Sequence, residues 1–217
     1  MSSKERKIWE KKQKENRIID IAEHIFLEKG YEQTTLIEIA NAAGYNKRTM
    51  YLYFKDREEI FLAVVLKGLT ILYNTLEKAL SEIDSKNGSL EKMGQGFFDF
   101  SLNHPKYLGL IMIYESNACI YYKETETEVN PEFYNSLCQQ KTDQLADLIT
   151  NAIEKGIKNK TIKTTLTPIQ LMLLIWGQVF GVMQIILMRK RHFKDAYGIS
   201  HEDLFNEFVT MMNKALS

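Results

Sequence analysis

The sequence has few of the residues that cross-link a chain or interrupt its helices. It contains two cysteines, Cys119 and Cys138, three prolines and eleven glycines among 217 residues. Two cysteines exclude a disulfide scaffold, and their surroundings show no metal-ligand spacing. We therefore expect free thiols in a reducing cytosol and a cytoplasmic protein. The few prolines and glycines leave long uninterrupted segments, which predict an all-α fold.

The sequence also lacks an apolar segment near its first residue and any recognisable catalytic motif. The missing apolar segment predicts that the protein is not secreted. There is no glycine-rich phosphate loop, no His-Glu metal pair and no nucleophile motif such as Gly-x-Ser-x-Gly. We therefore predict no catalytic residues, no cofactor and no metal site. A helical enzyme that assembles its chemistry from scattered residues stays open as an alternative.

Formal net charge is zero, so the charge of the whole chain does not argue for a nucleic-acid partner. The distribution of charge along the chain does argue for such a partner. Residues 1–17 hold seven lysines and arginines against three glutamates, which leaves this basic arm with a net charge of +4. A basic end on a neutral body is typical of a surface that faces DNA, although a solvated lysine-rich tail has the same composition.

Residues 34–60 predict a helix-turn-helix. Thr35 and Glu38 have the spacing of a capping box, and the apolar residues that follow repeat at helical intervals. Gly44 permits the positive φ that ends a helix and turns the chain sharply. Asn46 is a good cap for a second helix about three residues later. The segment therefore predicts two short helices joined by a tight turn.

The second of these helices carries cations and hydroxyls beside its buried side. Met50 and Phe54 are expected to enter the core. The remaining side chains, Lys47, Arg48, Thr49 and Tyr51, then point elsewhere. Arginine and lysine can donate to guanine edges, while threonine and tyrosine hydroxyls can reach phosphates. An ordinary solvated helix end could have the same composition.

The order of residues here resembles the DNA-binding domain of the tetracycline-repressor (TetR) family, over about residues 16–65. The residues that keep the family's spacing are Thr34, Ile39, Ala40, Ala43, Gly44, Thr49, Tyr51, Phe54, Glu58 and Ile60. The chain departs from the family at Arg48, where a small residue is frequent, and at Arg57, where a lysine usually reaches a phosphate. The long donor at Arg48 predicts a guanine contact particular to this protein.

The resemblance implies a ligand-responsive repressor that binds a palindromic operator as a homodimer. Its partners would be double-stranded DNA, a small effector and a second copy of the chain. Lys47 and Arg48 are expected to contact base edges. The expected phosphate contacts are Thr35, Thr49, Tyr51, Tyr53 and Arg57, and Thr34 and Asn46 complete the predicted DNA-binding set.

Helical periodicity continues to the end of the chain and predicts about nine helices. We expect an amino-terminal DNA-binding domain of three helices with its basic arm at residues 1–56. A helical domain for ligand binding and dimerisation should follow at residues 57–217, connected through a helix at 56–80. Residues 85–89 are predicted to be a linker and residues 121–130 a loop.

The most apolar stretch, residues 171–188, precedes a final helix at 204–216. Two such helices could dock against their copies in a four-helix interface, which is also what the resemblance implies. The predicted interface residues are Gly177, Gly181, Ile185, Leu204, Phe208 and Met212. A membrane span is the alternative for a stretch of this length. Gln178 and Gln184 interrupt the run, and a Thr167–Gln170 capping box precedes it, so we expect no membrane association.

Aromatic residues concentrate in the part of the chain that follows the linker. Most are expected to fill the core, yet aromatics and methionines are also the usual wall of a pocket for apolar or aromatic ligands. The candidate ligand-binding residues are Phe97, Phe98, Tyr107, Tyr114, Phe133, Tyr134, Trp176 and Phe180.

Overall fold

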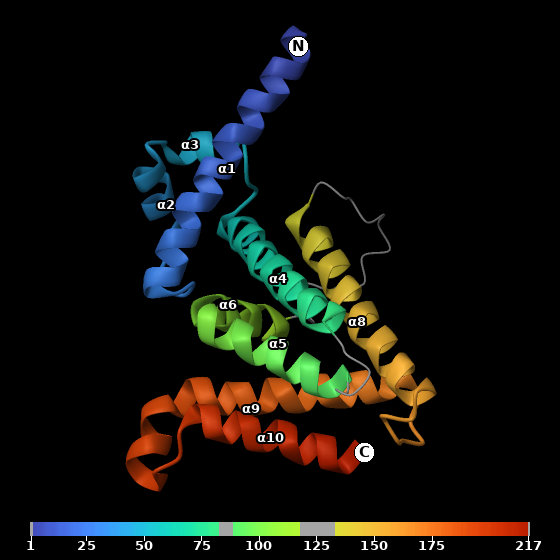
Figure 1. Cartoon of the computed structure of the whole chain (residues 1–217). Coiled ribbons are helices and arrows are strands. Elements are labelled where there is room, and N and C mark those ends of the chain that lie inside the picture. The colour runs from blue at the N-terminus through green and yellow to red at the C-terminus, as the bar shows by residue number, and fades with distance from the viewer. Residues whose placement is uncertain (1, 83–88, 118–132, 217) are drawn as a thin grey trace. The chain divides into compact units, whose positions relative to one another are not determined.

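The computed structural model describes residues 2–82, 89–117 and 133–216, without the side chains of residues 89 and 190–192, and the described residues form helices and turns but no strand (Figure 1). Cys119, most of the predicted linker and the predicted loop at 121–130 lie outside the described residues. The all-helical prediction is confirmed.

The chain divides into two compact units, residues 1–69 with 113–140 and residues 70–112 with 141–217. Three helices contribute residues to both units: α4 (Arg57–Ser81), α6 (Pro105–Ser116) and α8 (Tyr134–Lys158). The division into domains at residue 56 stays a prediction. Nothing in a continuous amphipathic helix marks a division between compact units.

The first unit is built around α1 (Ser3–Lys29), against which α2 (Leu36–Ala43) packs, and α3 (Lys47–Met50) follows α2 (Figure 1). Its core contains apolar side chains from each helix and from the start of α4. Those with no more than 2% of their surface exposed include Ile18, Ala22, Phe26, Ile39, Met50, Phe54, Ile60 and Phe61. Helix α1 is therefore the scaffold on which the helix-turn-helix packs.

The predicted turn between α2 and α3 forms as expected. Thr35 caps α2 by accepting a hydrogen bond from the Glu38 N–H at 3.2 Å. Only half of the capping box forms, because the Glu38 carboxylate pairs with Lys29 of α1. Gly44 ends α2 with φ 76°, and Asn46 caps α3 by accepting from the Thr49 N–H at 2.8 Å.

Two helices have bounds that the sequence pattern did not reveal. Helix α3 ends at Met50, because the N–H groups of Leu52 and Tyr53 donate to carbonyls three residues back and so tighten the chain into a turn. Helix α1 begins at Ser3, so the basic arm is helical. Ser2 and Glu5 form a complete capping box at its start.

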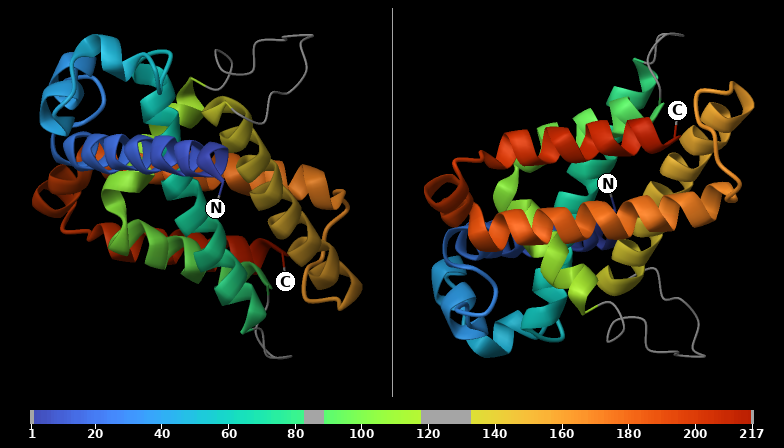
Figure 2. Two further views of the ribbon diagram at one scale, coloured as in Figure 1. Left: turned by 90° about the horizontal axis from the view of Figure 1, so that it is seen from above. Right: turned by 90° about the horizontal axis from the view of Figure 1, so that it is seen from below.

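The second unit contains α5 (Ser89–Asn103), α9 (Pro168–Tyr197) and α10 (His201–Leu216), with the remaining parts of α4, α6 and α8. Helices α9 and α10 lie side by side (Figure 2). The predicted Thr167–Gln170 capping box at the start of α9 is complete. The helix kinks at Arg189, where φ is −127° and ψ is 18°.

Close packing of glycines brings α5 against two neighbours within this unit. A Cβ atom on Gly96 would lie 2.9 Å from the Ala79 Cβ, and one on Gly94 would lie 3.0 Å from Val209 of α10. The two glycines therefore let α5 approach α4 and α10 closely. This close approach defines the walls of the cavity described below.

Candidate functional site

Two cations stand on the outer side of α3. Lys47 and Arg48 are exposed, while Met50 is completely buried and Phe54 is 2% exposed. The buried pair fixes which side of the short helix faces the core, and Asn46 fixes where the helix starts. Because lysine and arginine donate to guanine edges in a major groove, this side can contact base pairs.

Hydroxyl groups surround the two cations. Tyr51 is 51% exposed, and the Lys47 ammonium lies 5.9 Å from the centre of its ring. The Thr49 hydroxyl donates to the Asn46 side chain at 3.0 Å, and half-buried Tyr53 lies beside Tyr45 with ring centres 6.3 Å apart. Tyr51, one of the predicted phosphate contacts, is thus accessible in the structure.

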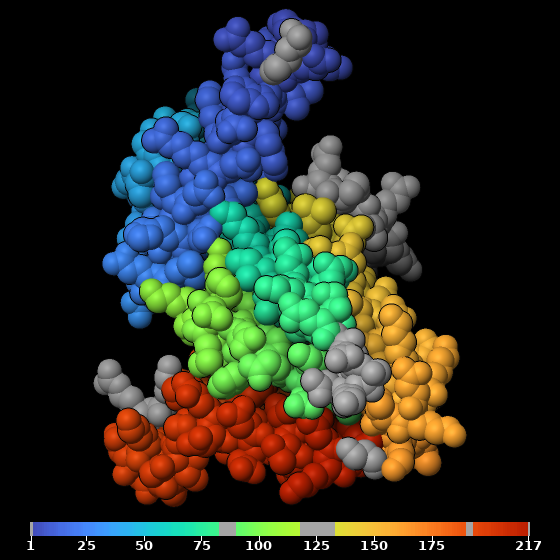
Figure 3. Space-filling view, in the orientation of Figure 1, coloured from blue at the N-terminus to red at the C-terminus, as the bar shows by residue number. Residues whose placement is uncertain are grey.

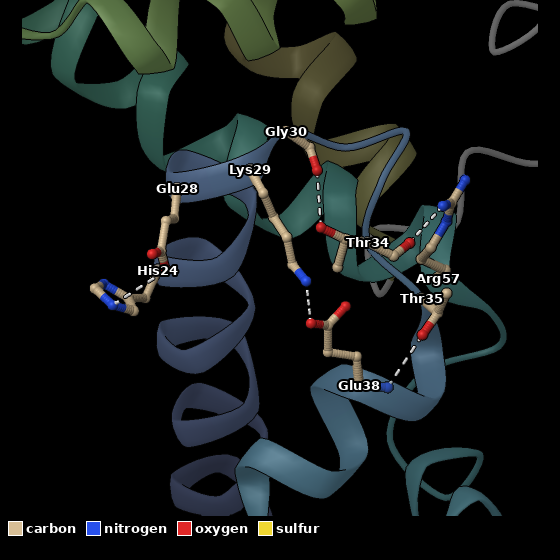
Figure 4. Close-up of polar contacts among 8 residues, drawn as sticks. All are labelled: His24, Glu28, Lys29, Gly30, Thr34, Thr35, Glu38 and Arg57. Carbon is tan, nitrogen blue, oxygen red and sulfur yellow. Dashed lines mark hydrogen bonds and ion pairs between the residues drawn. The ribbon is translucent and has the colours of Figure 1, made fainter.

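Thr34 does not belong to this exposed surface, which corrects the sequence prediction. Its side chain is completely buried, and its hydroxyl donates to the Gly30 carbonyl at 2.8 Å (Figure 4). Thr34 therefore holds the connection between α1 and α2. The spacing shared with the TetR family reflects this structural role.

Arg57 is committed to protein contacts that the sequence did not reveal. Its guanidinium lies 4.1 Å from the centre of the Tyr31 ring and donates to the carbonyls of Thr34 at 2.6 Å and Tyr31 at 3.3 Å. We call these contacts the Arg57 clamp. They join the start of α4 to the connection between α1 and α2, so the structure gives Arg57 a structural role, and its phosphate contact stays a prediction.

Ion pairs join the same helices on the surface of the unit. Lys29 of α1 pairs with Glu38 of α2, and this hydrogen bond is the main reason that the pKa of Glu38 is lowered (Figure 4). Lys67 of α4 pairs with Asp20 at 2.6 Å and with Glu23, both on α1. Burial raises the pKa of the Tyr31 hydroxyl, which is consistent with a neutral ring under the arginine. These ion pairs fix α2 and α4, the helices that precede and follow α3, to α1.

The second unit encloses an apolar cavity of about 70 Å³. Asn213 is the one polar side chain among its described lining residues, and the remainder are aliphatic, methionine or aromatic. The lining comes from α4, α5, α8, α9 and α10. The lining residues include Leu76, Gly94, Met172, Trp176, Phe205 and Val209.

The predicted ligand-binding residues separate into three groups. Phe97 and Trp176 line the cavity and meet edge to face at 6.5 Å, and Phe180 lines a neighbouring cavity of about 10 Å³. Phe98 stacks on the cavity residue Phe205, and buried Tyr107 lies beside His104. Tyr114, Phe133 and Tyr134 belong to the first unit and line neither cavity, which corrects the prediction for these three. The aliphatic lining was missed because aliphatic residues at helical spacing resemble ordinary core.

A stripe of apolar residues, interrupted by three glutamines, runs along the mostly exposed side of α9. Its residues recur at helical spacing, and we call them the α9 stripe: Gln170, Leu173, Leu174, Gly177, Gln178, Gly181, Gln184, Ile185 and Met188. Leu173 is 59% exposed and Met188 76% exposed. A Cβ on Gly177 or Gly181 would meet nothing within 4 Å, so both glycines leave the backbone open to an approaching partner.

The predicted interface residues of α10 face a different way. Phe208 is 9% exposed and, with Met212, lines the cavity of its own chain, while Leu204 is half-buried. The apolar side of α10 is thus used within the protomer. The exposed candidates for an interface are the residues of the α9 stripe.

The structure describes two helices with the length and apolar composition of a membrane span, Arg57–Ser81 and Pro168–Arg189. In the first, 56% of the most apolar window is buried, and in the second 22%. Core helices of soluble proteins have the same composition. The low value for the second helix reflects the α9 stripe.

The helical fold and the exposed cations of α3 define a helix-turn-helix protein of the DNA-binding class. Residues 18–64 match the family model described as bacterial regulatory proteins, tetR family. The match covers this segment, which is therefore similar to the DNA-binding domain of the TetR family. The resemblance over about residues 16–65 is confirmed.

Similar proteins extend this comparison. The transcriptional activator FasR of Mycolicibacterium smegmatis is 26% identical over 138 residues, which cover 64% of this chain and 59% of FasR. The fatty acid degradation regulator FadR of Bacillus halodurans has a similar structure, with a TM-score of 0.62, 19% identity and coverage of 91% and 93%. AibR, solved with isovaleryl coenzyme A and operator DNA, gives a TM-score of 0.60 at 15% identity, covering 91% and 97%. The two structures establish the shared fold.

Replacing Arg48 with alanine tests whether this side chain reads a base. Loss of a bidentate contact should weaken binding to the best DNA site by about 1–3 kcal/mol per half-site and relax the preference at one base pair. The measurement is affinity across a set of single-base variants of the site. Lys158→Ala, an exposed cation of the second unit, is the matched control. Undiminished discrimination in Arg48→Ala would exclude a base contact.

Replacing Arg57 with lysine tests the Arg57 clamp, because lysine keeps the charge but loses the planar stack and the paired donors. We expect the free energy of unfolding to fall by about 1–3 kcal/mol. Thermal or denaturant unfolding measures it. Arg57→Ala should leave the salt dependence of DNA binding unchanged. If Arg57→Lys were as stable as the wild type, and Arg57→Ala bound DNA with a shallower salt dependence, the results would contradict the clamp and support the predicted phosphate contact.

Proposed function

We propose that this chain is a homodimeric, ligand-responsive transcriptional repressor that binds a palindromic double-stranded operator in the cytoplasm. The observation that carries the proposal is the exposed Lys47–Arg48 pair, held outward on a capped helix by buried Met50 and Phe54. It lies inside the segment that matches the family. The catalytic alternative has no comparable site among the described residues.

The α9 stripe supports dimerisation. A long apolar face on a soluble helix is stabilised when a partner covers it, and two glycines four residues apart allow two helices to pack closely. Three glutamines in the stripe, Gln170, Gln178 and Gln184, would be costly against lipid. In a protein interface they can form hydrogen bonds. A second copy of the chain is therefore a better partner for the α9 stripe than lipid is.

The cavity supports an effector with an apolar group. A cavity of about 70 Å³ is smaller than the roughly 150 Å³ cavity that binds benzene in an engineered protein. A larger apolar group therefore has to move the helices that line the cavity. Such a ligand binds the expanded state better, and this difference in affinity is what shifts a population.

An acyl group is the effector class that we favour. The cavity lining is apolar, and the names of FadR and of the AibR complex refer to fatty acid degradation and to isovaleryl coenzyme A. Helix α4 carries Leu76 in the cavity lining and begins at Arg57. A shift of α4 would therefore reach the Arg57 clamp, and the two copies of α3 would no longer match successive major grooves.

Selection from a random duplex library tests the DNA-binding function. We expect enrichment of an inverted repeat, with half-sites about one helical turn apart or somewhat more, and two chains on each duplex. The repeat placed before a reporter gene should lower its expression when the chain is present. Equal binding to the enriched and to a scrambled duplex at low ionic strength would contradict the proposal. Higher expression would identify an activator.

Titration with fatty acids and acyl coenzyme A of increasing chain length tests the effector. We expect at least one to weaken operator binding by about 5- to 150-fold, the usual range of allosteric coupling. Val209→Phe should abolish the response by filling the cavity while keeping operator affinity. Phe98→Leu, outside the cavity, should keep both. A response that survives in Val209→Phe would place the effector elsewhere.

A further inference from the structure

Four lysines form a stripe along the first turns of α1. Lys4, Lys7, Lys11 and Lys14 follow one another at intervals of three, four and three residues, which places them on one side of a helix. They extend over about 15 Å at the helical rise of about 1.5 Å per residue. All four are exposed. We call these four residues the lysine stripe.

The acidic residues of the same segment are all engaged elsewhere. Glu5 closes the capping box with Ser2, Glu10 pairs with Arg6 at 2.9 Å, and Glu15 pairs with Lys12 at 2.9 Å. Within the described part of the chain, the lysine stripe makes no ion pair. The structure thus separates the arm's carboxylates from a row of four cations, none of which pairs with a described carboxylate.

The lysine stripe is held on a rigid support. The arm continues α1 directly from the buried residues Ile18 and Ile19, and Tyr134 anchors it by donating to Glu15 at 2.5 Å and stacking on Phe54 at 6.2 Å. Burial, reinforced by that hydrogen bond, raises the pKa of Tyr134, so the hydroxyl stays protonated. Figure 3 shows the first turns of α1, in dark blue, projecting beyond the rest of this helix.

We propose that the lysine stripe is a second DNA-binding surface, which contacts the sugar-phosphate backbone outside the half-site that α3 reads. The proposal rests on the proposed DNA-binding function. The stripe belongs to the same compact unit as Lys47 and Arg48. Over about 15 Å of duplex axis, DNA presents roughly nine phosphate charges, so four cations in a row have partners along their whole length.

Duplex DNA fits the lysine stripe better than an anionic membrane does. An amphipathic membrane helix needs a continuous apolar face beside its cations. The exposed apolar residues of the arm are Ile8 and Trp9, and helical periodicity places Trp9 on the side opposite the lysine stripe. The arm therefore lacks such a face, and its lysines match a rod of phosphates.

The consequence is affinity without sequence preference. Each lysine that neutralises a phosphate contributes about 0.9 to the slope of log affinity against log salt concentration. The stripe should therefore strengthen binding to any duplex that extends past the half-site. It should add nothing to binding of an operator trimmed to the base pairs that α3 contacts.

The test replaces the lysine stripe with glutamine, as Lys4→Gln, Lys7→Gln, Lys11→Gln and Lys14→Gln together. Glutamine keeps the helix propensity and removes the charge. The control carries Lys78→Gln, Lys155→Gln, Lys158→Gln and Lys163→Gln in the second unit, which changes the net charge equally. Affinities are measured at several salt concentrations, on the selected operator with long flanks, the trimmed operator and a scrambled duplex. Circular dichroism confirms that each variant is folded.

The stripe variant should lose affinity for the long operator and the scrambled duplex by the same factor, with a salt slope lower by about 3–4 for each bound chain. The control and the trimmed operator should show no such loss. Equal behaviour of stripe variant and wild type would overturn the proposal, as would an equal loss in the control. Stripe-dependent binding of wild type to phosphatidylserine vesicles, with DNA affinity unchanged, would assign the stripe to lipid. Failure of the wild type to prefer the operator would reject the proposed function instead.

Discussion

The position of the recognition helix depends on the Arg57 clamp. Helix α3 has four residues and contributes a single buried side chain, so its orientation also depends on the segments at its flanks. These flanks are fixed. The guanidinium of Arg57 joins α4 to the connection before α2, and Lys29 joins α1 to α2 through Glu38. The exposed Lys47 and Arg48 are therefore presented on a rigid frame, as recognition of base edges requires.

The same helix that carries the clamp also reaches the cavity. Helix α4 runs without interruption from Arg57 to Ser81 and places Leu76 in the cavity wall. Gly94 and Gly96 let α5 pack so closely that there is little free volume beside α4 and α10. An apolar group that exceeds the space in this cavity has to displace these helices. In the function that we propose, the small size of the cavity is what would couple an apolar effector to DNA binding.

Local patterns in the sequence predicted the helices, the Gly44 turn, the Asn46 cap and the Thr167–Gln170 capping box, because each depends on residues three or four apart. Local patterns could not reveal contacts between segments that lie far apart in the sequence. Thr34 and Arg57 are polar residues in a DNA-binding segment, and composition cannot show that one is buried and the other stacked on Tyr31. Phe208 and Met212 likewise look available for an interface, although both line the cavity of their own chain.

Methylation interference on the selected operator tests the central claim most directly, that α3 presents its cations to guanine edges in the major groove. Methylation of guanine N7 lies in this groove, whereas methylation of adenine N3 lies in the minor groove. The account predicts that N7 methylation within each half-site prevents binding, and that this interference disappears at one guanine in Arg48→Ala. Binding that tolerates N7 methylation throughout both half-sites but is blocked by adenine N3 methylation would contradict it.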